Sequence, residues 1–267
     1  MTRRLAGLLL LISISASGCF VPDDAQPTVG LSGELASKFV HRGMTQVDRP
    51  VVQPRLRVNL PTTSGDTIGF TAGGNVDLSN STGDAWFPDG HAGRFTEIDF
   101  VADYERQLND TFRIRAGIFN YNLPNGLEFP NGERGATTEI FATLSANVLD
   151  ATPYVSWHYD FDEVRGAYYR GGITEGFELA ENVVLTLDGS IGYVSGQQGS
   201  WLYGLDEAGF ADLRGSATVA WQVDGRTQLT GGVHGSLIVD STIDEWFALI
   251  NIDDDPIWFT LGVNWLF

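Results

Sequence analysis

Cysteine and long apolar segments are nearly absent from this chain of 267 residues. The single cysteine, Cys19, excludes an intrachain disulfide and any metal site that needs several thiolates. After residue 20, no apolar run approaches the ~20 residues that a membrane-spanning helix requires. Charged residues make up 19% of the chain, below the roughly 25% of ordinary soluble domains. Without spanning helices, such a chain crosses a membrane only as a closed β-barrel, which pairs every backbone polar group.

Basic residues are also scarce, with 16 Lys and Arg against 34 Asp and Glu and a net charge of −18. This balance argues against nucleic acid as a partner, because phosphate binding needs a basic patch. Glycine, by contrast, is abundant at 32 residues, and aromatic residues reach 12%. Together with short runs of Thr, Val and Ile, they predict an all-β fold.

The N-terminal residues have the three parts of an export signal, which are a basic start, a short apolar core and a small-residue cleavage zone. We therefore predict that residues 1–19 are a signal peptide. The sequence before Cys19 also resembles a bacterial lipoprotein signal, in which Cys19 becomes the lipidated first residue; ordinary cleavage nearby is the alternative. Residues 20–28 are expected to form a periplasmic tether, and residues 29–267 an outer-membrane barrel.

From residue 29 onward, apolar residues recur at every second position in separate runs, which is the period of a β-strand. Most runs are close to the ~9–11 residues of a tilted membrane strand, and an even number of them is typical of bacterial barrels. The pattern assigns no helix. The twelve predicted strands cover 29–42, 51–60, 67–79, 95–106, 111–121, 137–148, 153–162, 165–175, 183–194, 212–223, 226–239 and 256–267.

The connections between these runs are alternately long and short, and Asp224-Gly225 is a hairpin signal. Outer-membrane barrels have short periplasmic turns and longer extracellular loops. We therefore predict an up-and-down antiparallel barrel of about 12 strands with both termini in the periplasm. In the last run, one face is wholly apolar and ends in Trp265 and Phe267. This ending resembles the signal that the outer-membrane assembly machinery recognises, which favours the bacterial outer membrane and contact with membrane lipids.

The polar face of each run is expected to point into the lumen, because an arginine facing mid-membrane lipid costs roughly 2–4 kcal/mol. Two interpretations stay open: a water-filled channel with charged walls, or ion pairs that pack and plug the interior. Glu97, Asp99 and Asp103 are predicted to pair across a hairpin with Arg113 and Arg115, or to create a transverse field. The predicted lining comprises Glu34, Lys38, Arg55, Arg57, Asp77, Glu97, Asp99, Asp103, Arg113, Arg115, Glu139, His158, Asp160, Arg170, Asp188, Arg214 and His234.

Acidic residues crowd the predicted outer loops and would raise the local concentration of cations. Asp253-Asp254-Asp255 offers carboxylates but lacks the spacing of a calcium loop, so no metal site is predicted, and no cofactor either. His234-Gly235-Ser236 resembles the His-x-Ser pattern of outer-membrane phospholipases and lipid A deacylases, with Asp240 as a possible third group. The strand period turns His234 and Ser236 inward, away from lipid, so an enzyme is not expected.

The segment from Ser37 to Gln46, with Arg42-Gly43 followed by Thr45-Gln46, resembles the first-strand signature of the TorF-type porin family. His41 stands where that signature has phenylalanine. This resemblance implies an outer-membrane barrel for small-solute permeation. The expected function is thus passive diffusion of small hydrophilic solutes with a preference for cations. The alternatives are a structural or surface-binding barrel with a plugged lumen and a lipid hydrolase using His234 and Ser236.

Overall fold

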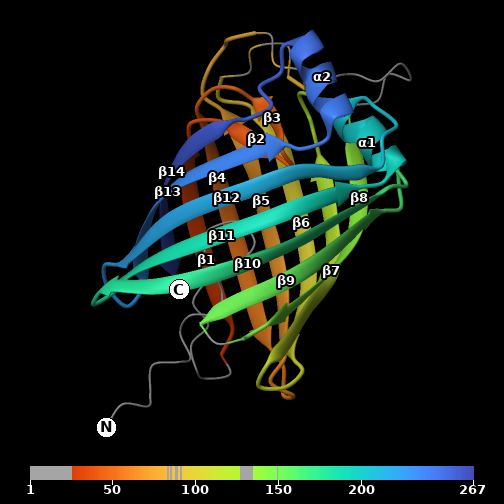
Figure 1. Cartoon of the computed structure of the whole chain (residues 1–267). Coiled ribbons are helices and arrows are strands. Elements are labelled where there is room, and N and C mark those ends of the chain that lie inside the picture. Colours follow the sequence, from red (N-terminus) through yellow and green to blue (C-terminus); the bar gives the residue numbers. More distant parts are fainter. Residues whose placement is uncertain are drawn as a thin grey trace.

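The computed structural model describes residues 26–82, 84, 86–87, 90, 92–126, 135–148 and 150–267. Within this part, the strands form one closed antiparallel barrel in the order β1-β14-β13-β12-β11-β10-β9-β8-β7-β6-β5-β4 (Figure 1). The predicted all-β barrel of twelve strands is confirmed. Its strands are β1 (Thr28–Ala36), β4 (Val51–Pro61), β5 (Thr67–Asp77), β6 (Phe95–Gln107), β7 (Phe112–Asn122), β8 (Ala136–Ala146), β9 (Ala151–Asp160), β10 (Ala167–Ala180), β11 (Val183–Val194), β12 (Gly209–Gln222), β13 (Thr227–Ile238) and β14 (Ile257–Leu266).

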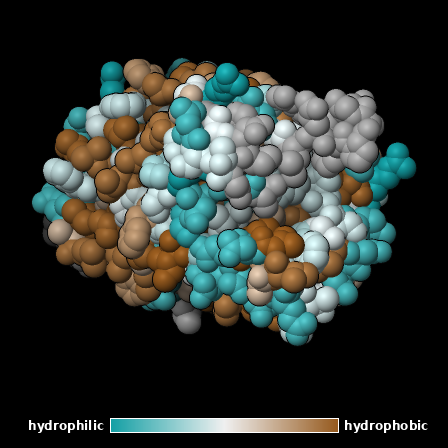
Figure 2. Space-filling model, turned by 90° about the horizontal axis from the view of Figure 1, so that it is seen from above, coloured by the Kyte–Doolittle hydropathy of each residue, from teal (hydrophilic) through white to brown (hydrophobic). Residues whose placement is uncertain are grey.

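The strand period sorts side chains between an apolar exterior and a polar interior. In β14, Phe259 is 60% exposed on the outside, whereas its neighbour Thr260 is 5% exposed on the inside. In β9, Val155 is 59% exposed and Ser156 is 8% exposed. Figure 2, a view onto the end that carries the helices, shows hydrophobic side chains along much of the periphery and hydrophilic ones between them. This arrangement suits a barrel whose outer belt faces lipid.

In the described residues, no helix has the length and apolar character required to span a membrane.

The two ends of the barrel differ in their connections. One end has tight turns, such as the one where Asp224 accepts hydrogen bonds from the backbone N–H groups of Arg226 and Thr227. The C-terminal strand closes the barrel near this end, because the N–H of Phe267 donates to the carbonyl of Val29 at 2.8 Å. The opposite end carries the longer connections and both helices (Figure 1). Short turns and long loops therefore lie at opposite ends, as the sequence predicts.

The first strand is shorter than predicted. β1 ends at Ala36 instead of continuing to residue 42. The chain then leaves the wall and forms a small separate hairpin, β2 (Phe39–His41) and β3 (Met44–Val47). The turn is tight because Arg42 (φ 48°) and Gly43 (φ 83°) both adopt left-handed backbone conformations. The sequence analysis assigned residues 37–42 to the first strand because they continue the run of β1 without a turn signal before Gly43.

Two helices occur where the sequence analysis assigned none. They are α1 (Gly196–Tyr203) and α2 (Ser241–Ile250). Each begins at a side-chain cap, Ser195 for α1 and Asp240 for α2, which accepts hydrogen bonds from the first backbone N–H groups of the helix. Both are short and lie in loops, so their helical period is hard to separate from irregular structure.

A hydrophobic core fills the loop end of the barrel. Val47 of the hairpin packs there with Phe87, with Leu202 of α1, and with Ile243 and Phe247 of α2, all of them fully or almost fully buried. The long connections are therefore folded together over the barrel opening. These connections hold the hairpin at the loop end of the barrel, so that the polar residues of the hairpin reach the lumen.

Residues 1–25 lie outside the described residues. The signal peptide, the lipidation of Cys19 and most of the predicted tether therefore remain predictions.

Candidate functional site in the barrel lumen

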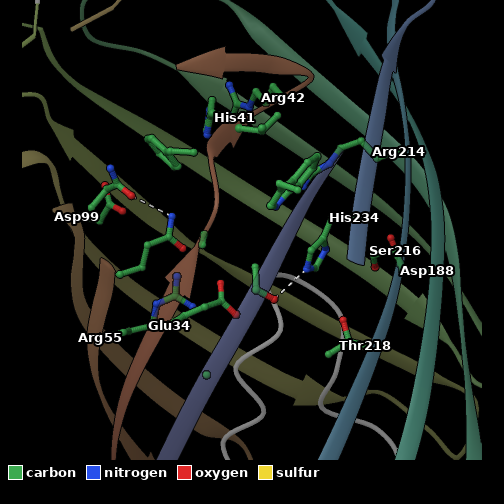
Figure 3. Close-up of a pocket in the computed structure, with 18 of the residues that line it drawn as sticks. Glu34, His41, Arg42, Arg55, Asp99, Asp188, Arg214, Ser216, Thr218 and His234 are labelled. Carbon is green, nitrogen blue, oxygen red and sulfur yellow. Dashed lines mark hydrogen bonds between the residues drawn. The ribbon is translucent and has the colours of Figure 1, made fainter. Parts of the chain in front are cut away.

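The lumen contains a cavity of about 350 Å³ between the barrel wall and the β2–β3 hairpin. Its lining residues come from both halves of the barrel, and most of them are polar or charged. Figure 3 shows Asp99 and Arg55 on one side, Arg214 and His234 on the other, and Arg42 near the hairpin above them. The chain thus encloses a cavity lined mostly by polar residues inside an apolar outer wall.

A buried ion pair holds the tip of the hairpin against the wall. Arg42 donates to both carboxylate oxygens of Glu139, with Nη1–Oε1 and Nη2–Oε2 distances of 2.8 and 2.7 Å. Glu139 also contacts the Tyr121 hydroxyl at 3.0 Å and Nδ1 of His158 at 3.2 Å. The Tyr203 hydroxyl of α1 donates to the Arg42 carbonyl at 2.8 Å. This bidentate, charge-assisted geometry fixes the orientation of the hairpin tip.

Arg42 keeps its positive charge in this buried position. Burial by itself would lower its pKa, but the Glu139 carboxylate outweighs that effect and raises the pKa. The guanidinium also lies 4.5 Å from the centre of the Tyr168 ring, a cation–π contact. Arg42 therefore stays protonated while only 5% exposed.

His41, beside Arg42, is held in its neutral form. Its ring meets Tyr121 edge-on at 5.9 Å between centroids. Burial and the charges of nearby arginines lower its pKa well below the usual range, although Glu139 acts in the opposite direction. An imidazolium at this position would face a predominantly cationic neighbourhood.

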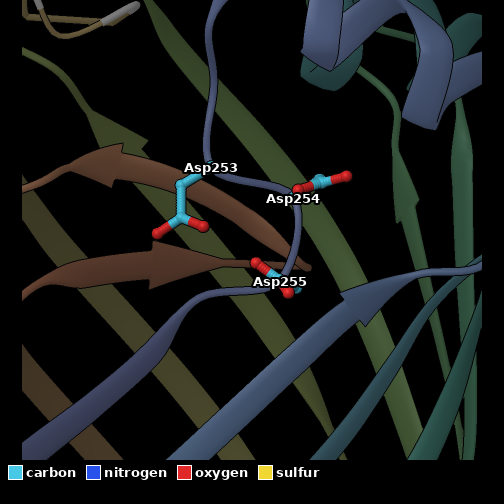
Figure 4. A group of neighbouring side chains, drawn as sticks. All are labelled: Asp253, Asp254 and Asp255. Atoms are coloured by element: carbon cyan, nitrogen blue, oxygen red, sulfur yellow. The ribbon is translucent and has the colours of Figure 1, made fainter.

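A second ion pair attaches the base of the hairpin to the connection before β14. Lys38 contacts Asp48 at 2.9 Å and also binds Asp253. Figure 4 shows the Asp253 carboxylate directed toward the hairpin strands and that of Asp254 directed away from them. Carboxylate oxygens of Asp253, Asp254 and Asp255 lie within 4.8 Å of one another. Of these three, Asp253 is the partner of Lys38 and so has a structural role.

Charged side chains of both signs line the cavity on opposite walls. In the closed ring of twelve strands, β6 and β12 are six positions apart and therefore face each other. β6 contributes the carboxylates of Glu97 and Asp99, whereas β12 contributes the guanidinium of Arg214. Each side also holds the opposite charge, because Arg55 lies on the side of Asp99 and Asp188 lies on the side of Arg214.

The predicted lining residues fall into two groups. The first group lines the cavity and comprises Glu34, Lys38, Arg55, Glu97, Asp99, His158, Arg170, Asp188, Arg214 and His234. The second group lies at other places in the barrel and comprises Arg57, Asp77, Asp103, Arg113, Arg115, Glu139 and Asp160.

Ion pairs and hydrogen bonds hold members of the second group near the two ends of the barrel. Asp103 accepts hydrogen bonds from Arg57 at 3.0 Å and from Arg115 at 2.9 and 3.1 Å, which forms a cluster nearer the turn end. At the loop end, Asp77 accepts from Arg49 at 3.0 Å. Asp160 accepts from the backbone N–H of Val164 at 3.1 Å and orders its own loop.

The predicted pairing of β6 with β7 is correct for one acidic residue only. Asp103 binds Arg115, but Arg113 pairs with Glu105 at 3.1 Å. The prediction was wrong for the other two carboxylates, Glu97 and Asp99, because the register places them near the loop end of β6. The two arginines lie opposite Gln107 and Glu105 instead.

Several cavity residues were missed because they are aromatic. Tyr154 and Tyr168 line the cavity although tyrosine also suits a lipid interface. Their positions two residues before Ser156 and Arg170 place them on the inward face, so strict use of the strand period would have found them. Arg42 was missed for another reason, since it was assigned to the end of a strand.

The candidate hydrolase residues are not joined into a catalytic arrangement. His234 contacts the Thr260 hydroxyl through Nε2 at 3.1 Å, and Ser236 donates to the carbonyl of Leu213 at 3.4 Å. Asp240 caps α2 at the loop end. A nucleophile and base need a direct hydrogen bond, and the structure directs both groups to other partners.

The closed barrel with its apolar belt and polar lumen defines an outer-membrane β-barrel protein, and the bacterial outer membrane is its location. No known family model matches the sequence, and no curated protein matches it either. Solved structures share the fold.

Among them is an outer-membrane channel from Pseudomonas putida F1, with 13% identity and a TM-score of 0.55, covering 93% of this chain and 100% of that one. LpxR from Salmonella typhimurium has 10% identity and a TM-score of 0.51, covering 88% and 99%. The NanC porin has 11% identity and a TM-score of 0.50, covering 89% and 98%. At these identities the likeness establishes the fold.

Proposed function

We propose that this protein is a porin-like channel that lets small hydrophilic solutes cross the outer membrane by diffusion. The observation that carries the proposal is the polar cavity of about 350 Å³ inside an apolar barrel. Its walls bear ionisable side chains with water-accessible surface, which favour hydrated, polar solutes over lipid. The fold shared with a porin and with an outer-membrane channel supports the same function.

The β2–β3 hairpin is the constriction in this proposal. It occupies the loop end of the lumen and is held by the Arg42–Glu139 pair. The cavity below it is at the lower end of the ~300–1,000 Å³ typical of small-molecule sites. We therefore expect permeation of small solutes and a steep decline with solute size.

A preference for cations is the finer part of the proposal, and we expect it to be small. Acidic loop residues attract cations to the opening. Two of them are already paired, because Asp84 binds Arg49 and Asp253 binds Lys38. A reversal potential measured under a KCl gradient tests this preference, and a value that indicates anion selectivity would contradict it.

The main experiment measures uptake into liposomes that contain the purified barrel. Swelling in isotonic solutions of glycerol, small sugars and larger oligosaccharides should be fast for the smallest solutes and absent for the largest. Protein-free liposomes are the control for leakage. Heat-dependent migration on gels shows that the reconstituted barrel is folded.

A barrel with a permanently closed lumen is the second candidate, favoured by the buried apolar core at the loop end. It predicts no swelling and no conductance in the wild-type protein or in the hairpin variant Arg42→Ala. Absence of swelling and of conductance in both folded proteins would overturn the channel proposal. The hydrolase alternative predicts phospholipid turnover that Ser236→Ala abolishes, and turnover by the wild-type protein would establish it instead.

A further inference from the structure

Arg214 differs from the other arginines around the cavity. Arg42 is paired with Glu139, and Arg170 contacts Asp212 at 3.3 Å. Arg55 also has an interaction partner. Among the residues that the structure describes, no hydrogen bond or ion pair reaches Arg214, whose one specific contact is with an aromatic ring. A guanidinium in a confined lumen thus has no anion beside it.

The carboxylates at neighbouring strand positions, Asp212 on β12 and Asp188 on β11, are already engaged by other groups. Asp212 accepts a hydrogen bond from the Tyr168 hydroxyl at 2.7 Å in addition to its contact with Arg170. Asp188 accepts from Thr174 at 2.7 Å and from Tyr154 at 3.3 Å. These contacts fix both carboxylates in place. Neither one turns toward Arg214 to neutralise it.

The surroundings of Arg214 form a defined pocket wall. Its guanidinium lies 5.6 Å from the ring centre of Trp258, which orients the side chain. The Trp258 ring stacks on His234 at 5.2 Å between centroids. Arg214, Ser216 and His234 are seen together on one side of the cavity in Figure 3.

A partly desolvated cation is costly unless an anion pairs with it. The planar guanidinium matches the two oxygens of a carboxylate. Among the described arginines of the cavity, Arg42, Arg55 and Arg170 are engaged, so the one remaining guanidinium fork can pair with one carboxylate group of a ligand.

We propose that Arg214 binds the carboxylate group of a small organic acid inside the lumen. This inference rests on the proposed function, because it names the solute class for which the channel has a binding subsite. The Trp258–His234 stack forms the adjoining wall, and the hydroxyl of Ser216 lies in the same lining. Small organic acids thus bind during passage, whereas neutral solutes cross without binding.

Equilibrium dialysis of the detergent-solubilised full-length barrel against radiolabelled succinate tests binding without requiring transport. The wild-type protein should bind succinate saturably. Loss of a hydrogen bond to a charged group should weaken the affinity of Arg214→Gln by about tenfold or more. The matched control is Arg226→Gln, which removes the same charge from an exposed turn and should bind like the wild type.

Arg214→Lys keeps the positive charge but loses the planar guanidinium and its paired N–H donors, so it should bind succinate with intermediate affinity. Thermal unfolding of the same variants in detergent separates binding from a packing role. If Arg214 serves a ligand, Arg214→Gln unfolds at the wild-type temperature or above it, because an unpaired charge has been removed.

Three results would overturn the inference. They are wild-type affinity in Arg214→Gln, equal loss in Arg226→Gln, or inorganic phosphate displacing succinate more effectively than unlabelled succinate does. Liposome swelling with glycerol is measured in parallel. Swelling without succinate binding would refute the proposed subsite but not the proposed channel. Succinate binding without swelling would refute the channel but not the subsite.

Discussion

Replacing Arg42 by alanine should open the constriction. The substitution removes both charge-assisted hydrogen bonds to Glu139, in a pair whose side chains are 6% and 3% exposed. Breaking a buried ion pair costs about 3–5 kcal/mol. Glu139 keeps its contacts with Tyr121 and His158, so the lower value of about 3 kcal/mol applies. That energy changes the ratio of displaced to seated hairpin by roughly a hundredfold.

Single-channel recording in planar bilayers measures this change. Arg42→Ala should conduct more, or stay open longer, than the wild-type protein at the same voltage. Arg106→Ala is the control, because Arg106 is 56% exposed and its contact with Asp66 is 3.8 Å long. An exposed pair of this kind contributes about 0–1 kcal/mol. Identical conductance of the wild type and a folded Arg42→Ala variant would refute the role of this pair in holding the constriction.

Three further predictions concern stability, pH and assembly. Gly69→Ala should lower the free energy of unfolding of the barrel in detergent by about 1–3 kcal/mol, because a Cβ there would meet the Arg57 guanidinium and lie 2.8 Å from Oδ1 of Asp103, two groups that their own hydrogen bonds hold in place; Gly189→Ala, with nothing within 4 Å, should not. Burial and nearby arginines lower the pKa of His41, so its neutral form stabilises the seated hairpin fully above pH ~6.5 and progressively less as the pH falls below that value. Conductance should therefore rise on acidification in the wild type and not in His41→Phe. Deleting Phe267 should reduce the amount of folded barrel in outer-membrane fractions, and undiminished assembly would remove its proposed role as a signal.

The barrel could be predicted from sequence because lipid imposes a simple rule on each strand. Val155 and Phe259 must tolerate hydrocarbon, while Ser156 and Thr260 face the lumen, and the alternation is visible without any tertiary information. Strand bounds follow the same rule to within a few residues in most places. The fold is therefore recoverable even though no family model matches the sequence.

The pairing of lumen charges could not be predicted in the same way. Side-chain parity shows that Asp103, Arg57 and Arg115 all point inward, but parity carries no information about height along the barrel axis. Height depends on register, which is set by the turns between strands. For this reason Asp103 could be assigned a partner only by chance, and Glu97 and Asp99 were assigned the wrong ones.

The hairpin shows that the sequence pattern of a strand does not distinguish a barrel strand from a segment that folds into the lumen. The first strand was predicted to continue to residue 42, yet residues 37–47 leave the wall and fold inward because their partners come from distant parts of the chain. Met44 accepts a hydrogen bond from the Trp86 indole at 3.0 Å, and Arg42 binds Glu139 on β8. Neither contact leaves a local signal. The hairpin that we propose as the constriction is therefore held in place by long-range pairing, and disrupting the Arg42 pair acts on the hairpin without altering the alternation that builds the wall.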